Sequence, residues 1–150
     1  MKLEQILPHK PPMVLLDRLL VADNDSAMCE VSISPRSPFY DHQLAGIPAY
    51  VGIEYMAQTI AAYSGALSQR EGSEPKVGFL LGSRKYKPSV AIYKQGQTLQ
   101  ISVRKLLEDS SGLSVFNCEI IDQDGMETLV RAKLNVFQPV EVEAWMQEKS

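Results

Sequence analysis

Cysteine, histidine and long apolar runs are scarce in this sequence, and each shortage excludes a class of protein. The 150 residues include 2 Cys and 2 His, too few and too widely spaced for a disulfide framework or a four-ligand zinc site. We therefore expect Cys29 and Cys118, each inside a strand-like pattern, to be small buried side chains. No stretch of about 20 apolar residues is present, so we expect no membrane-spanning helix.

A surplus of positive charge is also missing. The chain has 15 Lys and Arg against 18 Asp and Glu, and its pI is about 5.4. Neutralising nucleic-acid phosphates needs Lys and Arg gathered on one face, so we expect no nucleic-acid partner. Glu4, Pro8 and His9 stand where an export signal has an apolar segment, which favours a cytoplasmic location.

Repeats, linkers and several catalytic motifs are absent too. Without a repeat or a linker, and with 45% hydrophobic residues, the chain is predicted to form one folded domain over residues 1–150. It lacks G-x-S-x-G, G-x-G-x-x-G and P-loop motifs, which excludes a serine-hydrolase elbow, a dinucleotide fold and a Walker-type nucleotide site.

The hydrophobic pattern that is present indicates one long helix followed by strands. Residues 50–70 combine large apolar and many small residues with a single early charge, Glu54, which predicts a mostly buried helix. Alternation predicts a strand over residues 26–33, whereas residues 13–21 are compatible with a short helix or a strand. Four later strands are expected at 77–86, 98–107, 113–121 and 129–137, and the last ten residues form a short acidic segment. The expected class is α+β, with an antiparallel sheet that packs on or curls round the helix.

Two side chains are candidates for proton transfer. Glu54 lies on the predicted buried helix, where a carboxylate needs a partner or a purpose; the alternative is a helix-capping role in the first turn. Gln58 lies one turn further on and shares its face. His42 stands in a Gly- and Pro-containing loop before the helix, and imidazole exchanges protons near neutral pH; the alternative is a solvated loop residue.

Two motifs resemble the β-hydroxyacyl-acyl-carrier-protein dehydratases of bacterial fatty-acid synthesis. Residues 7–18 look like that family's opening segment, and Pro48 with the Glu54–Gln58 segment matches its Pro-Gly and Glu-Ala-Met-Ala-Gln pattern. Residues 78–80 fit the strand that follows. The chain is most similar to the branch associated with aryl-polyene pigments. The family pattern has two more residues between the His and the Pro, and Gly in place of Ala49.

The resemblance implies a hotdog fold, an antiparallel sheet wrapped around a long central helix. It implies a dimer whose sites lie at the subunit interface. This dimer would be either a homodimer or a heterodimer with a related hotdog subunit. It also implies dehydration of a (3R)-3-hydroxyacyl thioester carried on the phosphopantetheine of an acyl carrier protein, in fatty-acid or polyene synthesis, without metal or other cofactor. The catalytic pair would be His42 of one chain facing Glu54 of the other, and the backbone N–H of Ala49 would bind the thioester oxygen. The remaining residues expected at the substrate site are Gly46, Pro48, Gln58, Gly78, Phe79 and Leu80.

Two other functions remain open on the sequence. A thioesterase of the same fold would use the helix carboxylate to activate water, and the shortened loop is compatible with a weakly active or non-catalytic partner subunit. Arg84, Lys85, Lys87 and Lys94 form an acid-free basic segment. This segment is interpreted either as a docking surface for an acidic carrier protein or as a solvated strand edge.

Overall fold

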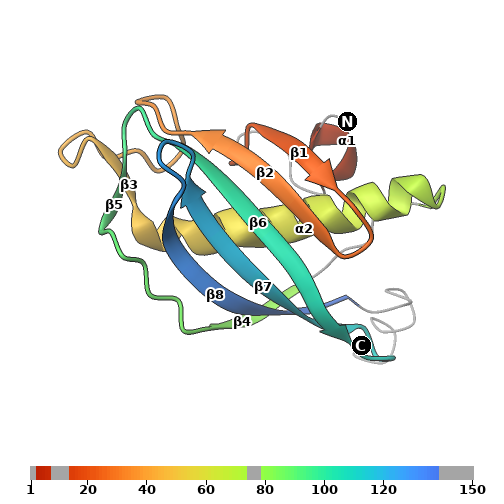
Figure 1. The fold of residues 1–150 in the computed structure, drawn as a ribbon. Helices are drawn as coiled ribbons and strands as arrows, with labels where there is room; N and C mark the ends of the chain where they lie inside the picture. Colours follow the sequence, from red (N-terminus) through yellow and green to blue (C-terminus); the bar gives the residue numbers. More distant parts are fainter. Residues whose placement is uncertain (1–2, 8–13, 74–78, 139–150) are drawn as a thin grey trace, which may run out of the picture.

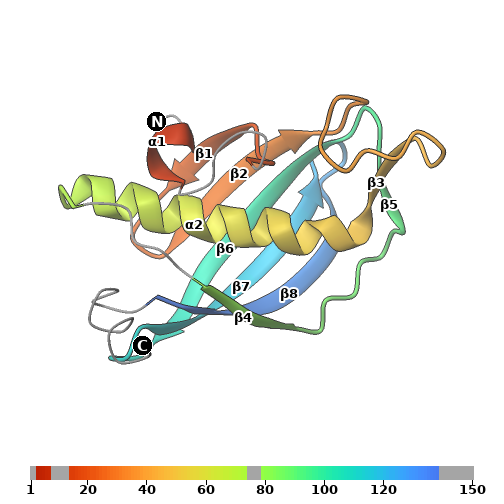
Figure 2. The same ribbon diagram turned by 180° about the vertical axis from the view of Figure 1, so that it is seen from behind.

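The computed structural model describes residues 3–7, 14–73 and 79–138, and it is built around one long helix. Helix α2 (Gly52–Arg70) lies across the inner face of a curled antiparallel sheet (Figures 1 and 2). The strands of this sheet follow the order β1, β2, β6, β7, β8, β4. Their bounds are β1 Arg18–Ala22, β2 Ser26–Ser32, β4 Phe79–Arg84, β6 Thr98–Glu108, β7 Leu113–Asp122 and β8 Glu127–Phe137.

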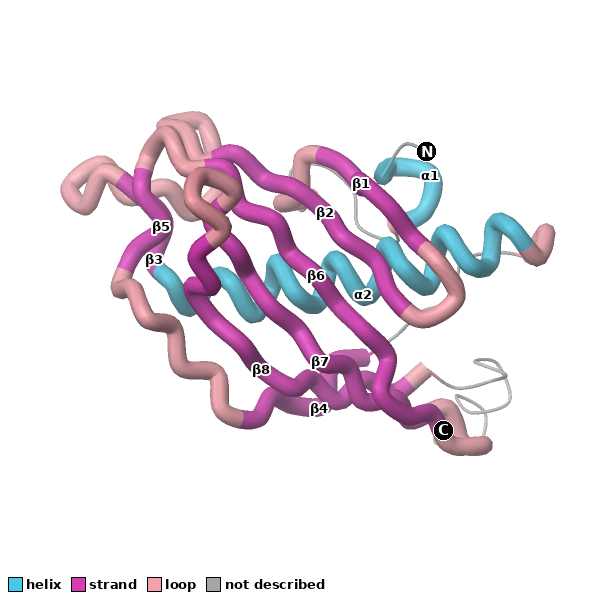
Figure 3. The backbone as a smooth tube through the Cα atoms, in the orientation of Figure 1, coloured by secondary structure: helices cyan, strands magenta, loops and turns pink. Residues whose placement is uncertain are grey.

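A second, two-stranded sheet leads into the helix. Strand β3 (Gly46–Pro48) pairs with β5 (Ile92–Lys94), and the 3-10 turn η1 (Ala49–Val51) joins β3 directly to α2. Both short strands lie at the end of the molecule where α2 begins (Figure 3). A short helix, α1 (Leu3–Ile6), lies toward the other end of α2.

The structure confirms the predicted class and most of the predicted elements. The helix, β2, β6, β7 and β8 agree with their expected ranges to within about two residues. The ambiguous segment 13–21 contains the edge strand β1, which has a bulge between Leu19 and Val21. Strands β3 and β5 were not predicted, because three residues are too few to establish an alternating pattern. Residues 77–78 and the acidic segment 141–150 lie outside the described residues.

The core forms between the inner face of the sheet and α2. Alternate residues of the central strands point inward and are buried, among them Leu99, Ile101 and Val103 of β6. The helix presents Met56 and Ile60 to them, and two of its polar residues, Gln58 and Thr59, are fully buried as well. As expected from its composition, α2 is buried along most of its length.

One glycine and one tyrosine hold the C-terminal half of α2 in place. At Gly65, a Cβ would overlap the carbonyl of Ile6, so only glycine permits this approach of α1. The Tyr63 hydroxyl donates to the Asn24 carbonyl at 2.5 Å, which ties the helix to the β1–β2 turn. In the described part of the chain, no helix is both long and apolar enough to cross a membrane.

Candidate functional site

The candidate site is built on the junction of β3, η1 and α2. Gly46, Ile47 and Pro48 pair with Lys94, Tyr93 and Ile92, which follow them by 44 to 48 residues. A strand from a distant part of the chain therefore sets the direction in which the segment enters the helix. A Cβ at Gly46 would overlap the Tyr93 carbonyl, which explains the glycine. Gly46 and Pro48 therefore lie next to the helix start.

The loop before β3 is a short closed turn. Asp41 and Gly46 form an isolated bridge, with N–H to carbonyl distances of 2.8 and 3.3 Å. The Asp41 carboxylate accepts the backbone N–H groups of Gln43 and Leu44 at 2.9 and 3.1 Å, and Ala45 takes a left-handed φ of 54°. These bonds close the shortened loop, in which His42 is the first residue after the Asp41–Gly46 bridge.

His42 is exposed in this chain, and its described neighbour is an aromatic ring. The Tyr40 ring meets the imidazole edge-on, with the ring centroids 4.9 Å apart. The Tyr40 hydroxyl donates to Oε1 of Gln95 at 2.9 Å, which fixes that ring against the β5 side of the site. Sequence reasoning did not single out Tyr40, although it lies only two residues before His42.

Glu54 lies half-buried in the first turn of α2, beside Gln58. Nε2 of Gln58 donates to Oε1 of Glu54 at 3.4 Å, and Oε1 of Gln58 accepts the Leu15 N–H at 2.9 Å. Glu54 and Gln58, which were expected to share one face of the helix, are thus hydrogen-bonded. Leu15, which lies 43 residues before Gln58 in the sequence, is bonded to Gln58 as well. A fully buried amide with bonds on both sides has little rotational freedom, so it orients the carboxylate.

The role expected for the Ala49 N–H requires correction. This N–H donates to the Ala91 carbonyl at 2.9 Å, because residue 49 extends the β3–β5 pairing by one step. A group that already donates inside the protein is not free to bind a thioester oxygen. The expectation came from the residue's position after Pro48, which does not reveal a partner in a distant strand.

The other predicted site residues lie on strand β4 or outside the described residues. Phe79 and Leu80 open β4, where they pair with Phe137 and Val136 of β8. Gly78 lies outside the described residues.

Both cysteines are buried, as predicted, and neither is reactive in character. Burial raises the pKa of the Cys29 thiol and of the Cys118 thiol to about 12. Among the described residues, no three His, Cys, Asp or Glu side chains gather in a way that would hold a metal ion.

Comparison with known structures identifies the fold. The ApeI:P dehydratase heterocomplex of Xenorhabdus doucetiae superposes with a TM-score of 0.87 at 30% identity, covering 100% of this chain and 99% of the other. A hypothetical thioesterase protein with coenzyme A, from Streptococcus pneumoniae, has a TM-score of 0.63 at 11% identity over 81% of this chain and 84% of its own; it shares the fold alone. The structure is a hotdog fold of the dehydratase type.

Sequence comparison then identifies the family within that class. Residues 1–147 match the ApeP-like family, described as ApeP dehydratase, and the chain belongs to that family. It is also 29% identical over 87 residues to the 3-hydroxyacyl-[acyl-carrier-protein] dehydratase FabZ of Streptococcus equi subsp. zooepidemicus, covering 57% of this chain and 61% of the relative. The FabZ of a Methylobacterium strain is 26% identical over 110 residues, covering 71% and 66%. The match thus spans about three fifths of the length of the first of these relatives.

Proposed function

We propose that this chain takes part in the dehydration of a (3R)-3-hydroxyacyl thioester, carried on an acyl carrier protein, to the trans-2-enoyl thioester. The observation that carries the proposal is the Glu54 carboxylate, oriented by buried Gln58 in the first turn of α2. It lies a few residues after the loop that presents His42, in a chain of a dehydratase family.

The proposed reaction removes one proton and one hydroxyl group from the substrate. His42 takes the proton from C2, the electrons form the C2–C3 double bond, and the C3–O bond breaks. Glu54 assists departure of the hydroxyl, and the proton taken from C2 is returned to it, so that water leaves and the side chains keep no extra proton. The N-terminal end of α2 carries partial positive charge and favours the negative charge that develops on the thioester oxygen.

We propose that a second hotdog subunit completes the site, in a homodimer or, preferably, in a heterodimer. Three observations support a partner at this face. His42 is exposed in the loop before β3, and Tyr50 in η1, just before α2, is 70% exposed. Figure 2 shows the first half of α2 without any other described element over it. The neighbour of Xenorhabdus doucetiae is itself part of a dehydratase heterocomplex, ApeI:P.

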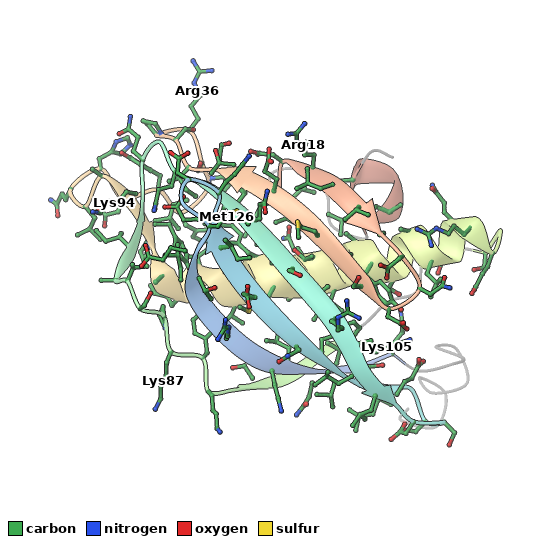
Figure 4. The ribbon with its side chains drawn as sticks, in the orientation of Figure 1. Arg18, Arg36, Lys87, Lys94, Lys105 and Met126 are labelled. Carbon is green, nitrogen blue, oxygen red and sulfur yellow. The ribbon has the colours of Figure 1, made fainter. Side chains whose placement is uncertain are left out.

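An acyl carrier protein is the proposed donor of the substrate. Lys85, Lys87 and Lys94 are exposed along the segment that joins β4 to β5 and on β5 itself, and Figure 4 shows Lys87 and Lys94 extending outward. Lys94 pairs with Gly46, at the base of the His42 loop. The side chain of Arg84 lies outside the described residues.

The test is a dehydration assay with 3-hydroxyacyl carrier protein, run on the chain alone and on its complex with a co-expressed related hotdog subunit. We expect His42→Ala and Glu54→Gln to lower turnover about 10²- to 10⁴-fold, as expected for loss of general acid–base catalysis. Glu71→Gln, an exposed glutamate after α2, is the control and should retain activity. Equal rates in the wild type and both site variants would refute the assignment of the pair.

The same assay separates the two other functions. A thioesterase would release free thiol and depend little on His42. A non-catalytic subunit would form a stable complex whose dehydration rate is unchanged by either substitution.

A further inference from the structure

The start of α2 lacks a capping side chain from its own sequence. Pro48 precedes η1 and Val51 precedes α2, and neither provides a side-chain hydrogen bond to the free N–H groups. Residues 48–52 contain no Ser, Thr, Asp or Asn, the residues that usually provide this bond. The junction that carries Glu54 must therefore be held from elsewhere.

Two tyrosine hydroxyls from distant segments meet at this junction. Tyr86, in the β4–β5 connection, donates to the Ala49 carbonyl at 2.5 Å. Tyr93, on β5, lies 3.2 Å from the same carbonyl and 3.2 Å from the Tyr86 hydroxyl. The backbone N–H of Ile53 approaches the Tyr86 oxygen from the first turn of α2. One pair of hydroxyls thus bonds to the turn that leads directly into the helix.

The packing around these hydroxyls leaves little room for movement. Tyr93 is fully buried, and a Cβ on Gly52 would overlap both hydroxyl oxygens. The glycine therefore lets the helix backbone lie directly on the pair. Because a peptide unit is planar, holding the Ala49 carbonyl also fixes the orientation of the following peptide, through which η1 leads into α2.

We infer that Tyr86 and Tyr93 are positioning residues that hold the start of α2, where no capping side chain does so, and thereby set the position of Glu54 relative to the substrate. The inference rests on the proposed function for its kinetic consequence, because a displacement of about 1 Å at a reacting group can lower turnover about 10²-fold. Burial raises the pKa of both phenols, so both keep their protons and can donate near neutral pH.

The same helix provides a matched control at its other half. The Tyr63 hydroxyl also donates to a backbone carbonyl at 2.5 Å, but this bond lies more than two turns beyond Glu54. Tyr63→Phe therefore removes an equivalent buried bond from α2 without touching the junction. A purely structural role predicts that Tyr63→Phe, Tyr86→Phe and Tyr93→Phe behave alike.

The experiment measures kcat, KM and backbone hydrogen exchange for the three variants in the complex that is active. We expect Tyr86→Phe and Tyr93→Phe to lower kcat about tenfold or more with KM changed less than about twofold, and to speed exchange over residues 50–55. Tyr63→Phe should keep kcat within about twofold and speed exchange only near residues 63–70. Equal effects on kcat from all three variants, or unchanged exchange over residues 50–55, would overturn the inference. If the wild type shows no dehydration, the proposed function fails, and the exchange pattern still decides whether the tyrosines hold the junction.

Discussion

At the scale of single residues, Gln58 joins the N-terminal segment to the candidate catalytic carboxylate. Gln58→Leu keeps a similar volume but leaves the Leu15 N–H without its acceptor and Glu54 without this donor. We expect a loss of about 1–3 kcal/mol of unfolding free energy, measured by urea denaturation, together with a fall in kcat. Gln69→Leu, on the exposed end of the same helix, is the control. If both variants were equally stable and equally active, Gln58 would not have the orienting role described above.

At the scale of elements, the connection from β4 to β5 brings both the tyrosine pair and exposed lysines to the helix start. If a carrier protein docks there, Lys87→Glu with Lys94→Glu should raise KM for a carrier-bound substrate about tenfold at low salt. KM for a small thioester should not change, and the effect should shrink as salt screens the charges. Arg104→Glu, at an exposed position of β6, is the control. An unchanged KM for the carrier-bound substrate, or an equal rise with Arg104→Glu, would place docking elsewhere.

At the scale of the whole molecule, the core buries several groups that must remain protonated. Burial raises the pKa of Cys29 and Cys118 to about 12, and it also raises the pKa of Tyr55 and Tyr93. In the unfolded chain, these groups ionise near their ordinary pKa values of about 8.5 for Cys and about 10 for Tyr. The buried neutral groups therefore make their full contribution to the free energy of unfolding below about pH 8.5. This contribution is lost as the pH rises toward 12.

We accordingly expect the free energy of unfolding, measured by urea denaturation, to fall steadily from about pH 9 to pH 11. The slope should reach up to about 1.4 kcal/mol per pH unit for each group that ionises on unfolding. Thiol titration at pH 8 should detect neither cysteine until urea unfolds the chain. A flat stability profile across this range, or rapid labelling of the folded protein, would contradict the burial of these groups.

The sequence by itself determined the elements whose signals are local. The long helix and the strands β2, β6, β7 and β8 were predictable because each repeats its apolar pattern over at least seven residues. The meeting of Glu54 with Gln58 was predictable for the same reason, since residues four apart on a helix are neighbours.

Tertiary structure alone decided how the helix start is held. Ala49 uses its N–H on Ala91 and its carbonyl on Tyr86 and Tyr93, and the two tyrosines lie 37 and 44 residues away in the chain. Likewise, the three-residue strands β3 and β5 exist only because each pairs with the other. No pattern within a short window encodes such contacts, because the packing of the whole chain brings their partners together.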